Sequence, residues 1–237
     1  MIRGWRSCLG AGLVMLVVSP ALADGAPLQL PSATPVTSAA AAIANSAVPA
    51  TIATVDAATA IARANTYFNN TTTLVGDFVQ IGADGRRSEG KLYVQKPGRL
   101  RFEYADPATL EIVADGKSVA IRDRKLATQD LYFIWQTPLK FLLNSKIDLA
   151  RDTKVLDVSS NQDSTSITVD DTATLGGTSR IRLVFDPTSF AIKQWSVIDP
   201  QGYETLVSLF NVNTTTKPDP SLFQITYATG RDDSPYR

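Results

Sequence analysis

Apolar and polar residues alternate with a period of two along most of the chain after Thr72. The clearest case is 98–105 (GRLRFEYA), where Leu100, Phe102 and Tyr104 point one way and the residues between them point the other. Eleven such segments follow one another, and most connections are too short for parallel crossovers. The pattern predicts mostly antiparallel strands at 73–82, 88–96, 98–105, 109–116, 117–123, 126–133, 154–160, 164–171, 179–186, 190–199 and 203–212.

Two stretches break this alternation with helical spacing. Residues 57–70 follow Asp56, a good N-cap, and carry apolar residues on one face. Between the sixth and seventh strands, Thr137 is a candidate N-cap with Pro138 at the first helical position, and three leucines follow on one face. A helix halfway through one antiparallel sheet is well placed to cover the mouth of a barrel. So many strands favour a strongly curved sheet or barrel, mainly β with a few helices (α+β).

One face of the predicted sheet is apolar. In 179–186, Ile181, Leu183 and Phe185 oppose Arg180 and Arg182, as in the strand 98–105. Eleven strands curve around more space than their side chains fill, whereas about eight give an interior that side chains just fill. Periodicity does not separate a lined cavity from a packed core, and both remain open. The residues predicted to line or cover the interior, here called the interior set, are Leu74, Phe78, Leu100, Phe102, Tyr104, Ile112, Ile121, Leu139, Leu142, Leu143, Ile181, Leu183 and Phe185.

The first 23 residues have the pattern of a cleavable secretory signal. Arg3 and Arg6 precede an apolar run at 9–18, and Ala21-Leu22-Ala23 supplies a small-x-small cleavage site. The run is too short for a membrane-spanning helix. We therefore expect export, with a mature chain that begins at Asp24.

Residues 24–55 are rich in Ala, Pro, Ser and Thr and almost without charge or aromatic residues, which predicts a disordered linker. The sequence has 23 basic and 23 acidic residues, and loss of Arg3 and Arg6 leaves a net charge of −2. Such a balance gives no support for nucleic-acid binding. The single cysteine, Cys8, lies in the predicted signal, so the mature chain forms no disulfide.

The chain contains no histidine. Without His and a mature Cys, nucleophile systems of the Ser-His-Asp and Cys-His types are excluded, and zinc and copper lose their usual ligands. The remaining candidates for catalysis are carboxylates such as Glu89, Asp106 and Glu111, for which surface charge is the simpler explanation. We expect no catalytic residue, no metal and no cofactor.

A series of motifs follows the first helix: F-x-Q at Phe78 and Gln80, EGKLYVQKPGRLRFEY at 89–104, D-P at Asp106-Pro107, IVADGKSVAIRD at 112–123, QTPLKFLL at 136–143, FDPTSFAIKQWSVIDPQG at 185–202 and NVNTTTKPDPSLFQI at 211–225. In this order they resemble the outer-membrane lipoprotein carrier protein family, LolA, over about residues 56–227. No single motif is diagnostic, but the combination is specific.

The resemblance implies an unclosed antiparallel β-barrel of about eleven strands, with a helical lid over an apolar cavity. It divides the chain into a signal peptide at 1–23, a linker at 24–55, a lipid-carrier domain at 56–228 and a flexible tail at 229–237. Members take acylated lipoproteins from an inner-membrane ABC transporter, LolCDE, and deliver them through the periplasm to an outer-membrane acceptor, in some bacteria LolB. The chemistry is binding only, and we expect a monomer.

Family members also place a basic residue directly before the Pro of the K-P-G-R segment. In the best-studied form it is Arg, whose hydrogen bonds to the lid backbone hold the empty cavity shut. Here the position is Lys96, which has one point charge and no planar fork. Two interpretations remain open: a lid latch that donates to carbonyls near 137–144, or a solvated strand end.

Two other functions compete with lipoprotein carriage. LolA-like domains also occur in periplasmic stress-response sensors, which add a second C-terminal domain for which we expect no room here. A glycolipid or a sterol-like lipid would use the same cavity.

Overall fold

The computed structural model describes residues 55–226 and consists mainly of one antiparallel sheet. The predicted signal at 1–23, the predicted linker up to residue 54 and the predicted tail at 229–237 lie outside the described residues. The strands are β1 (Thr73–Ile81), β2 (Arg87–Gln95), β3 (Arg99–Tyr104), β4 (Leu110–Asp115), β5 (Ser118–Asp123), β6 (Thr128–Phe133), β7 (Lys154–Ser160), β8 (Thr165–Thr174), β9 (Gly177–Phe185), β10 (Ile192–Ile198) and β11 (Glu204–Asn213). All eleven predicted strands are confirmed.

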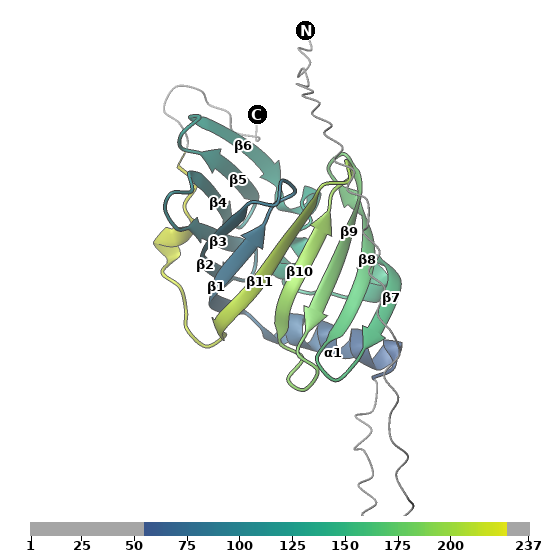
Figure 1. Ribbon diagram of the computed structural model, residues 1–237. Helices are drawn as coiled ribbons and strands as arrows, with labels where there is room; N and C mark the ends of the chain where they lie inside the picture. Colours follow the sequence, from purple (N-terminus) through teal and green to yellow (C-terminus); the bar gives the residue numbers. More distant parts are fainter. Residues whose placement is uncertain (1–54, 227–237) are drawn as a thin grey trace, which may run out of the picture. The chain divides into compact units, whose positions relative to one another are not determined.

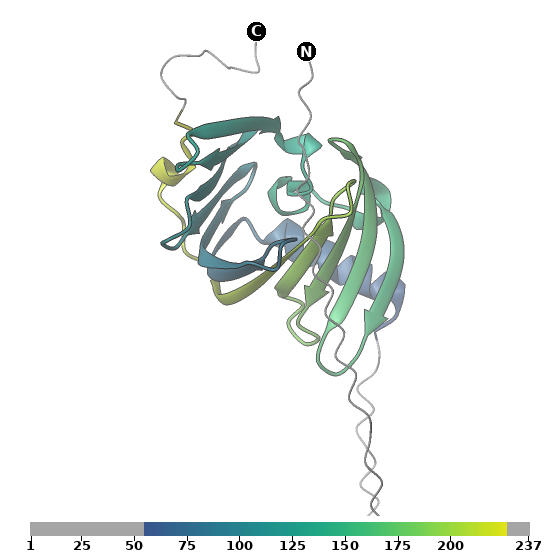
Figure 2. The ribbon, with the colours of Figure 1, turned by 45° about the horizontal axis from the view of Figure 1, so that its top comes forward.

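The sheet is curved but unclosed. Its order is β6-β5-β4-β3-β2-β1-β11-β10-β9-β8-β7, so β1 pairs with both β2 and β11, and β6 and β7 are the edges. Each half is a meander of hairpins, and all neighbouring strands are antiparallel (Figure 1). Turned by 45°, the view shows the sheet curling around a short helical segment (Figure 2). The predicted unclosed antiparallel architecture is confirmed.

Helix α1 (Ala57–Asn70) begins where Asp56 accepts hydrogen bonds from the backbone N–H and the hydroxyl of Thr59. This is the N-cap that the sequence predicts. Ala60, Ala64 and Phe68 are spaced by four residues and form one fully buried stripe. This face contacts β7, β8 and the short helix α3 (Leu149–Asp152).

Residues 134–153, here called the crossover, connect the two edges of the sheet. They contain the 3₁₀ helix η1 (Ile134–Gln136), the short helix α2 (Lys140–Leu143) and α3. The prediction that Thr137 caps a helix with Pro138 at its first position is wrong. The Thr137 hydroxyl donates back to the Ile134 carbonyl at 2.8 Å, so it closes the preceding 3₁₀ turn and leaves α2 to begin at Lys140.

A C-terminal segment covers part of the outer face of the sheet. The 3₁₀ helix η2 (Pro220–Phe223) contacts β3 and β4, and Phe223 is buried there. Val113 and Ala120, which face outward from β4 and β5, are also buried. Gln224 and Ile225, which follow η2, line one small pocket together with Val113 and Ala120, so this segment covers two strand positions that break the expected polar outer face.

Candidate functional site

The inner face of the curved sheet is a continuous apolar surface. Across β2, β3 and β4, Leu92 lies opposite Phe102, which lies opposite Ile112. Across β9 and β10, Leu183 lies opposite Trp195. Because neighbours in register share a face, both halves of the sheet direct their apolar residues to the same interior.

The interior set lies on this face or on the crossover. Ten of its members are buried: Leu74, Phe78, Leu100, Phe102, Tyr104, Leu142, Leu143, Ile181, Leu183 and Phe185. Three are half-buried: Ile112, Ile121 and Leu139. The two half-buried residues of this set that belong to strands lie on β4 and β5, so the apolar interior is least covered beside these strands.

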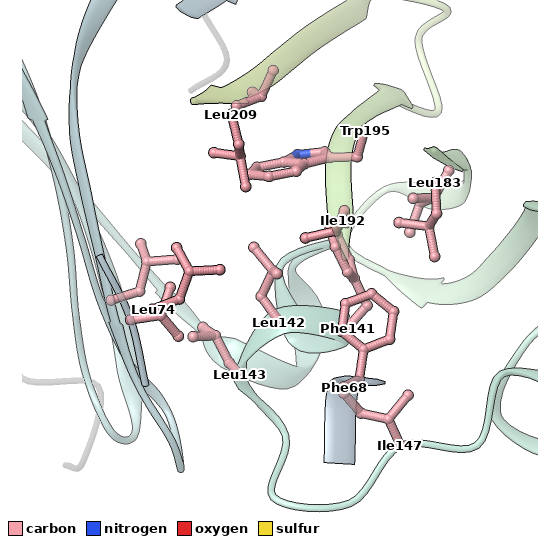
Figure 3. Close-up of a cluster of buried hydrophobic side chains, with 14 of the residues drawn as sticks. Phe68, Leu74, Phe141, Leu142, Leu143, Ile147, Leu183, Ile192, Trp195 and Leu209 are labelled. Carbon is pink, nitrogen blue, oxygen red and sulfur yellow. The ribbon is translucent and has the colours of Figure 1, made fainter. Parts of the chain in front are cut away.

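The helices fill the interior in this conformation. Phe141 and Leu142 of α2 and Phe68 of α1 belong to the same buried cluster as the strand residues Leu74 and Leu183. Figure 3 shows α2 between these strands, with its side chains directed among theirs. The interior is therefore apolar, as the alternation predicts, and is packed in this conformation rather than open.

An aromatic group lies in the part of the interior under β1 and β3. The Phe78 ring meets Phe102 and Tyr104 edge to face, with ring centroids 5.0 and 5.1 Å apart. The Tyr104 hydroxyl donates to Gln80 Oε1 at 2.8 Å, which satisfies its polar end. Burial raises the pKa of Tyr104 above its usual range, so its phenol stays neutral at neutral pH.

Two asparagines of α1 hold the crossover. The Asn69 side chain donates to the Ile147 carbonyl at 2.9 Å and accepts from the Ile147 N–H at 2.8 Å. The N–H of Leu149 donates to Asn65 Oδ1 at 3.0 Å. The sequence analysis missed both roles because their partners lie about eighty residues away in the chain.

Lys96 bonds to α1 and not to the 137–144 segment, so the sequence prediction of its partner is wrong. Its half-buried ammonium donates to the carbonyl of Phe68, in the last turn of α1, at 2.6 Å and lies 5.8 Å from the Phe68 ring centroid. The segment is instead held by the backbone: the N–H of Gly98 donates to the Leu143 carbonyl at 2.9 Å. Burial lowers the pKa of Lys96 to about 8.

The carboxylates considered for catalysis lie apart from this interior. Glu89 pairs with Arg87 at 2.6 Å on the exposed surface, Glu111 pairs with Arg101 at 2.9 Å, and Asp106 lies in the turn after β3. Within residues 55–226, no group of three His, Cys, Asp or Glu residues is placed to hold a metal ion. In the same range, no helix is both long and apolar enough to cross a membrane.

The sequence is similar to those of known proteins. The family model described as outer membrane lipoprotein carrier protein LolA matches residues 69–226. Two proteins named outer-membrane lipoprotein carrier protein are similar in part: that of Chromobacterium violaceum is 38% identical over 73 residues (30% of this chain, 35% of the relative), and that of Alkalilimnicola ehrlichii is 37% identical over 65 residues (25% and 30%). The chain thus matches about a third of the length of these relatives.

Among solved structures, a LolA superfamily protein from Nitrosomonas europaea aligns with 72% of this chain and 98% of its own chain. The sequence identity is 9% and the TM-score is 0.41.

Proposed function

The chain belongs to the family of outer membrane lipoprotein carrier proteins, LolA, and we propose that it binds the acyl chains of lipoproteins in its interior and carries them to the outer membrane. The observation that carries this proposal is that helices cover the apolar inner face of the sheet, while the two edge strands stay unpaired with each other. Strands β6 and β7 do not pair, and the crossover between them is held by apolar side-chain packing and a few hydrogen bonds. Such a cover can move without breaking the sheet.

The energetic task is to keep acyl chains out of water. Each buried CH₂ contributes about 0.8 kcal/mol, so an exposed palmitoyl chain costs on the order of 10 kcal/mol. In the closed conformation, Phe68, Phe141 and Leu142 occupy the interior in place of such a chain. Loading exchanges one set of apolar contacts for another, which allows tight shielding and still permits release. The proposed role is binding without catalysis.

The interior set supplies the proposed lipid-binding residues. Ile112, Ile121 and Leu139, its half-buried members, are the first that an arriving chain can reach, and the ten buried members follow once the helices move. We place the protein in the periplasm after cleavage at Ala23, which the intact mass of the periplasmic protein would check. An inner-membrane ABC transporter is the proposed donor, and a LolB-like protein, where present, is the proposed acceptor.

Lipid binding is tested with the purified mature protein. A dansyl-labelled fatty acid is expected to gain fluorescence on binding, and a triacylated lipopeptide is expected to displace it at equimolar concentration. The same peptide without acyl chains serves as the control and is expected to leave the fluorescence unchanged. A protein that binds neither the fatty acid nor the lipopeptide is not a lipid carrier.

Lys96 is the proposed latch between α1 and the turn that connects β2 with β3. Its pKa is about 8 in the folded protein and 10.5 in the unfolded chain, so between these values the unfolded state binds more protons. The free energy of unfolding therefore rises with pH across this window through Lys96. Lys96→Met is expected to lack this rise. Urea unfolding of both proteins at neutral pH and near pH 10 measures the difference, and equal pH profiles would show that Lys96 does not titrate as a buried group.

A further inference from the structure

A buried ion pair also attaches the crossover to the sheet. Lys140, the first residue of α2, places its Nζ 2.7 Å from Oδ1 of Asp171 on β8, and the two side chains are 15% and 1% exposed. The residues are 31 positions apart in the chain. The pair therefore ties the middle of the crossover to the inner face of the sheet.

This ion pair is poorly suited to a purely structural role. Burying two charges carries a desolvation cost that their attraction offsets only when the remaining polar atoms are also satisfied. Asp171 Oδ1 also accepts from the N–H of Ala173 at 3.0 Å, but Oδ2 is buried with no hydrogen-bond partner within residues 55–226. Because one oxygen is unsatisfied, the pair stabilises the closed state less than a fully hydrogen-bonded pair would, although separating the two charges still has a cost.

The pair lies beside a small apolar cavity. A space of about 30 Å³ opens between the crossover and strands β8 and β9, and its lining includes both Lys140 and Asp171. Six apolar residues complete most of this wall: Phe141, Ile147, Leu149, Val169, Ile181 and Leu183. The space holds about one water molecule, so an acyl chain fits only if α2 moves away from β8 and β9.

We propose that this cavity is the start of an acyl-chain subsite and that the Lys140–Asp171 pair is its gate. The inference rests on the proposed carrier function. When the pair separates, α2 moves off β8 and a saturated chain lies along the apolar wall of β8 and β9. Lys140, at the rim, is then able to donate a hydrogen bond to the ester or amide carbonyl at the polar end of the lipid.

The adjacent residue provides a matched control. Asp170 lies on the opposite face of β8 and pairs with Arg180 at 2.9 Å, and the Asp170 and Arg180 side chains are 17% and 54% exposed. Asp170→Asn and Asp171→Asn thus remove the same charge from the same strand, one from the surface and one from the gate.

The gate is tested by the rate at which the purified protein takes up a dansyl-labelled fatty acid. Asp171→Asn is expected to raise this rate about tenfold or more, the scale of a lost charged hydrogen bond, and Asp170→Asn is expected to leave it unchanged. In Lys140→Leu/Asp171→Leu, apolar contacts replace the charges, so uptake is expected to be no faster than in the parent. If the parent protein binds the probe and the Asp171→Asn variant takes it up at the same rate, the pair is not a gate, and the proposed carrier function is unaffected.

The subsite is tested independently on the unaltered protein. Palmitic acid with a photoreactive diazirine near its chain end is expected to label peptides from α2, β8 and β9. Labelling confined to β3–β6 would overturn the subsite even if Asp171→Asn fails to fold. Absence of both labelling and probe binding in the parent would instead overturn the proposed function itself.

Discussion

Gly90→Ala is expected to destabilise the protein by more than about 3 kcal/mol, the upper end of the range for overpacked sites. Gly90 lies in the middle of β2, opposite Tyr104 of β3. A Cβ atom added there would lie 2.0 Å from the carbonyl oxygen of Glu103 and 2.9 Å from the Tyr104 Cα. Both are backbone atoms of the paired strand, so β2 and β3 would have to separate. Urea unfolding followed by circular dichroism measures the loss.

Gly82→Ala is the control within the same hairpin. The nearest atom to a Cβ at Gly82 is Oδ1 of the exposed Asp84 side chain at 3.1 Å. Because this carboxylate can shift, the substitution is expected to change the stability by less than about 1 kcal/mol. If the Gly90→Ala variant were as stable as the Gly82→Ala variant, the backbones of β2 and β3 would not approach each other as closely at Gly90 as described.

The alternation of apolar and polar residues predicted the sheet well because it is a local property of each strand. In β3, Leu100, Phe102 and Tyr104 are buried while Arg99 and Glu103 are exposed, as expected. The pattern could not show whether the enclosed face lines a cavity or forms a core. That depends on which helices fold into the interior, and here Phe68 and α2 fill it.

Contacts between distant charged residues could not be predicted in this way. Lys140 and Asp171 are residue types that usually lie on the solvated surface. Neither strand nor helix periodicity indicates that these two side chains meet. Lys96 was identified through the family pattern, but its acceptor depends on where α1 ends in space. A helix was predicted to begin at Thr137 and Pro138 because these residues fit a helix start, whereas the Thr137 hydroxyl donates backward to the Ile134 carbonyl.

The proposed latch at Lys96 and the proposed gate formed by Lys140 and Asp171 also differ in strength. The hydrogen bond from Lys96 to the Phe68 carbonyl favours the closed state, but burial of the same ammonium opposes it and lowers its pKa. Asp171 in contrast faces a cation, so removing its charge leaves Lys140 buried without a partner carboxylate. The crossover is therefore expected to respond more strongly to Asp171→Asn than to Lys96→Met.

Phe102→Glu is expected to leave the protein largely unfolded. Phe102 is 3% exposed, and its ring centroid lies 5.0 Å from that of Phe78 and 6.5 Å from that of Trp195. Loss of such a side chain costs about 3–5 kcal/mol, and a carboxylate in its place adds the cost of burying a charge. Total stabilities of about 5–15 kcal/mol leave little reserve. Tryptophan fluorescence and circular dichroism during urea unfolding measure the change, and Phe102→Leu is expected to lose less than half as much stability.

Ile112→Glu separates this structural effect from lipid binding. Ile112 lies next to Phe102 on the same inner face, but it is only half-buried, so a glutamate there can reach solvent without disrupting the core. The variant is expected to fold and to bind the dansyl-labelled fatty acid at least tenfold more weakly, because a charge now lies where the chain would first contact the interior. Unchanged binding by a folded Ile112→Glu protein would show that lipids do not enter beside β4. Labelling of β8 and β9 by the diazirine fatty acid would then leave the cavity under α2 as the route into the interior.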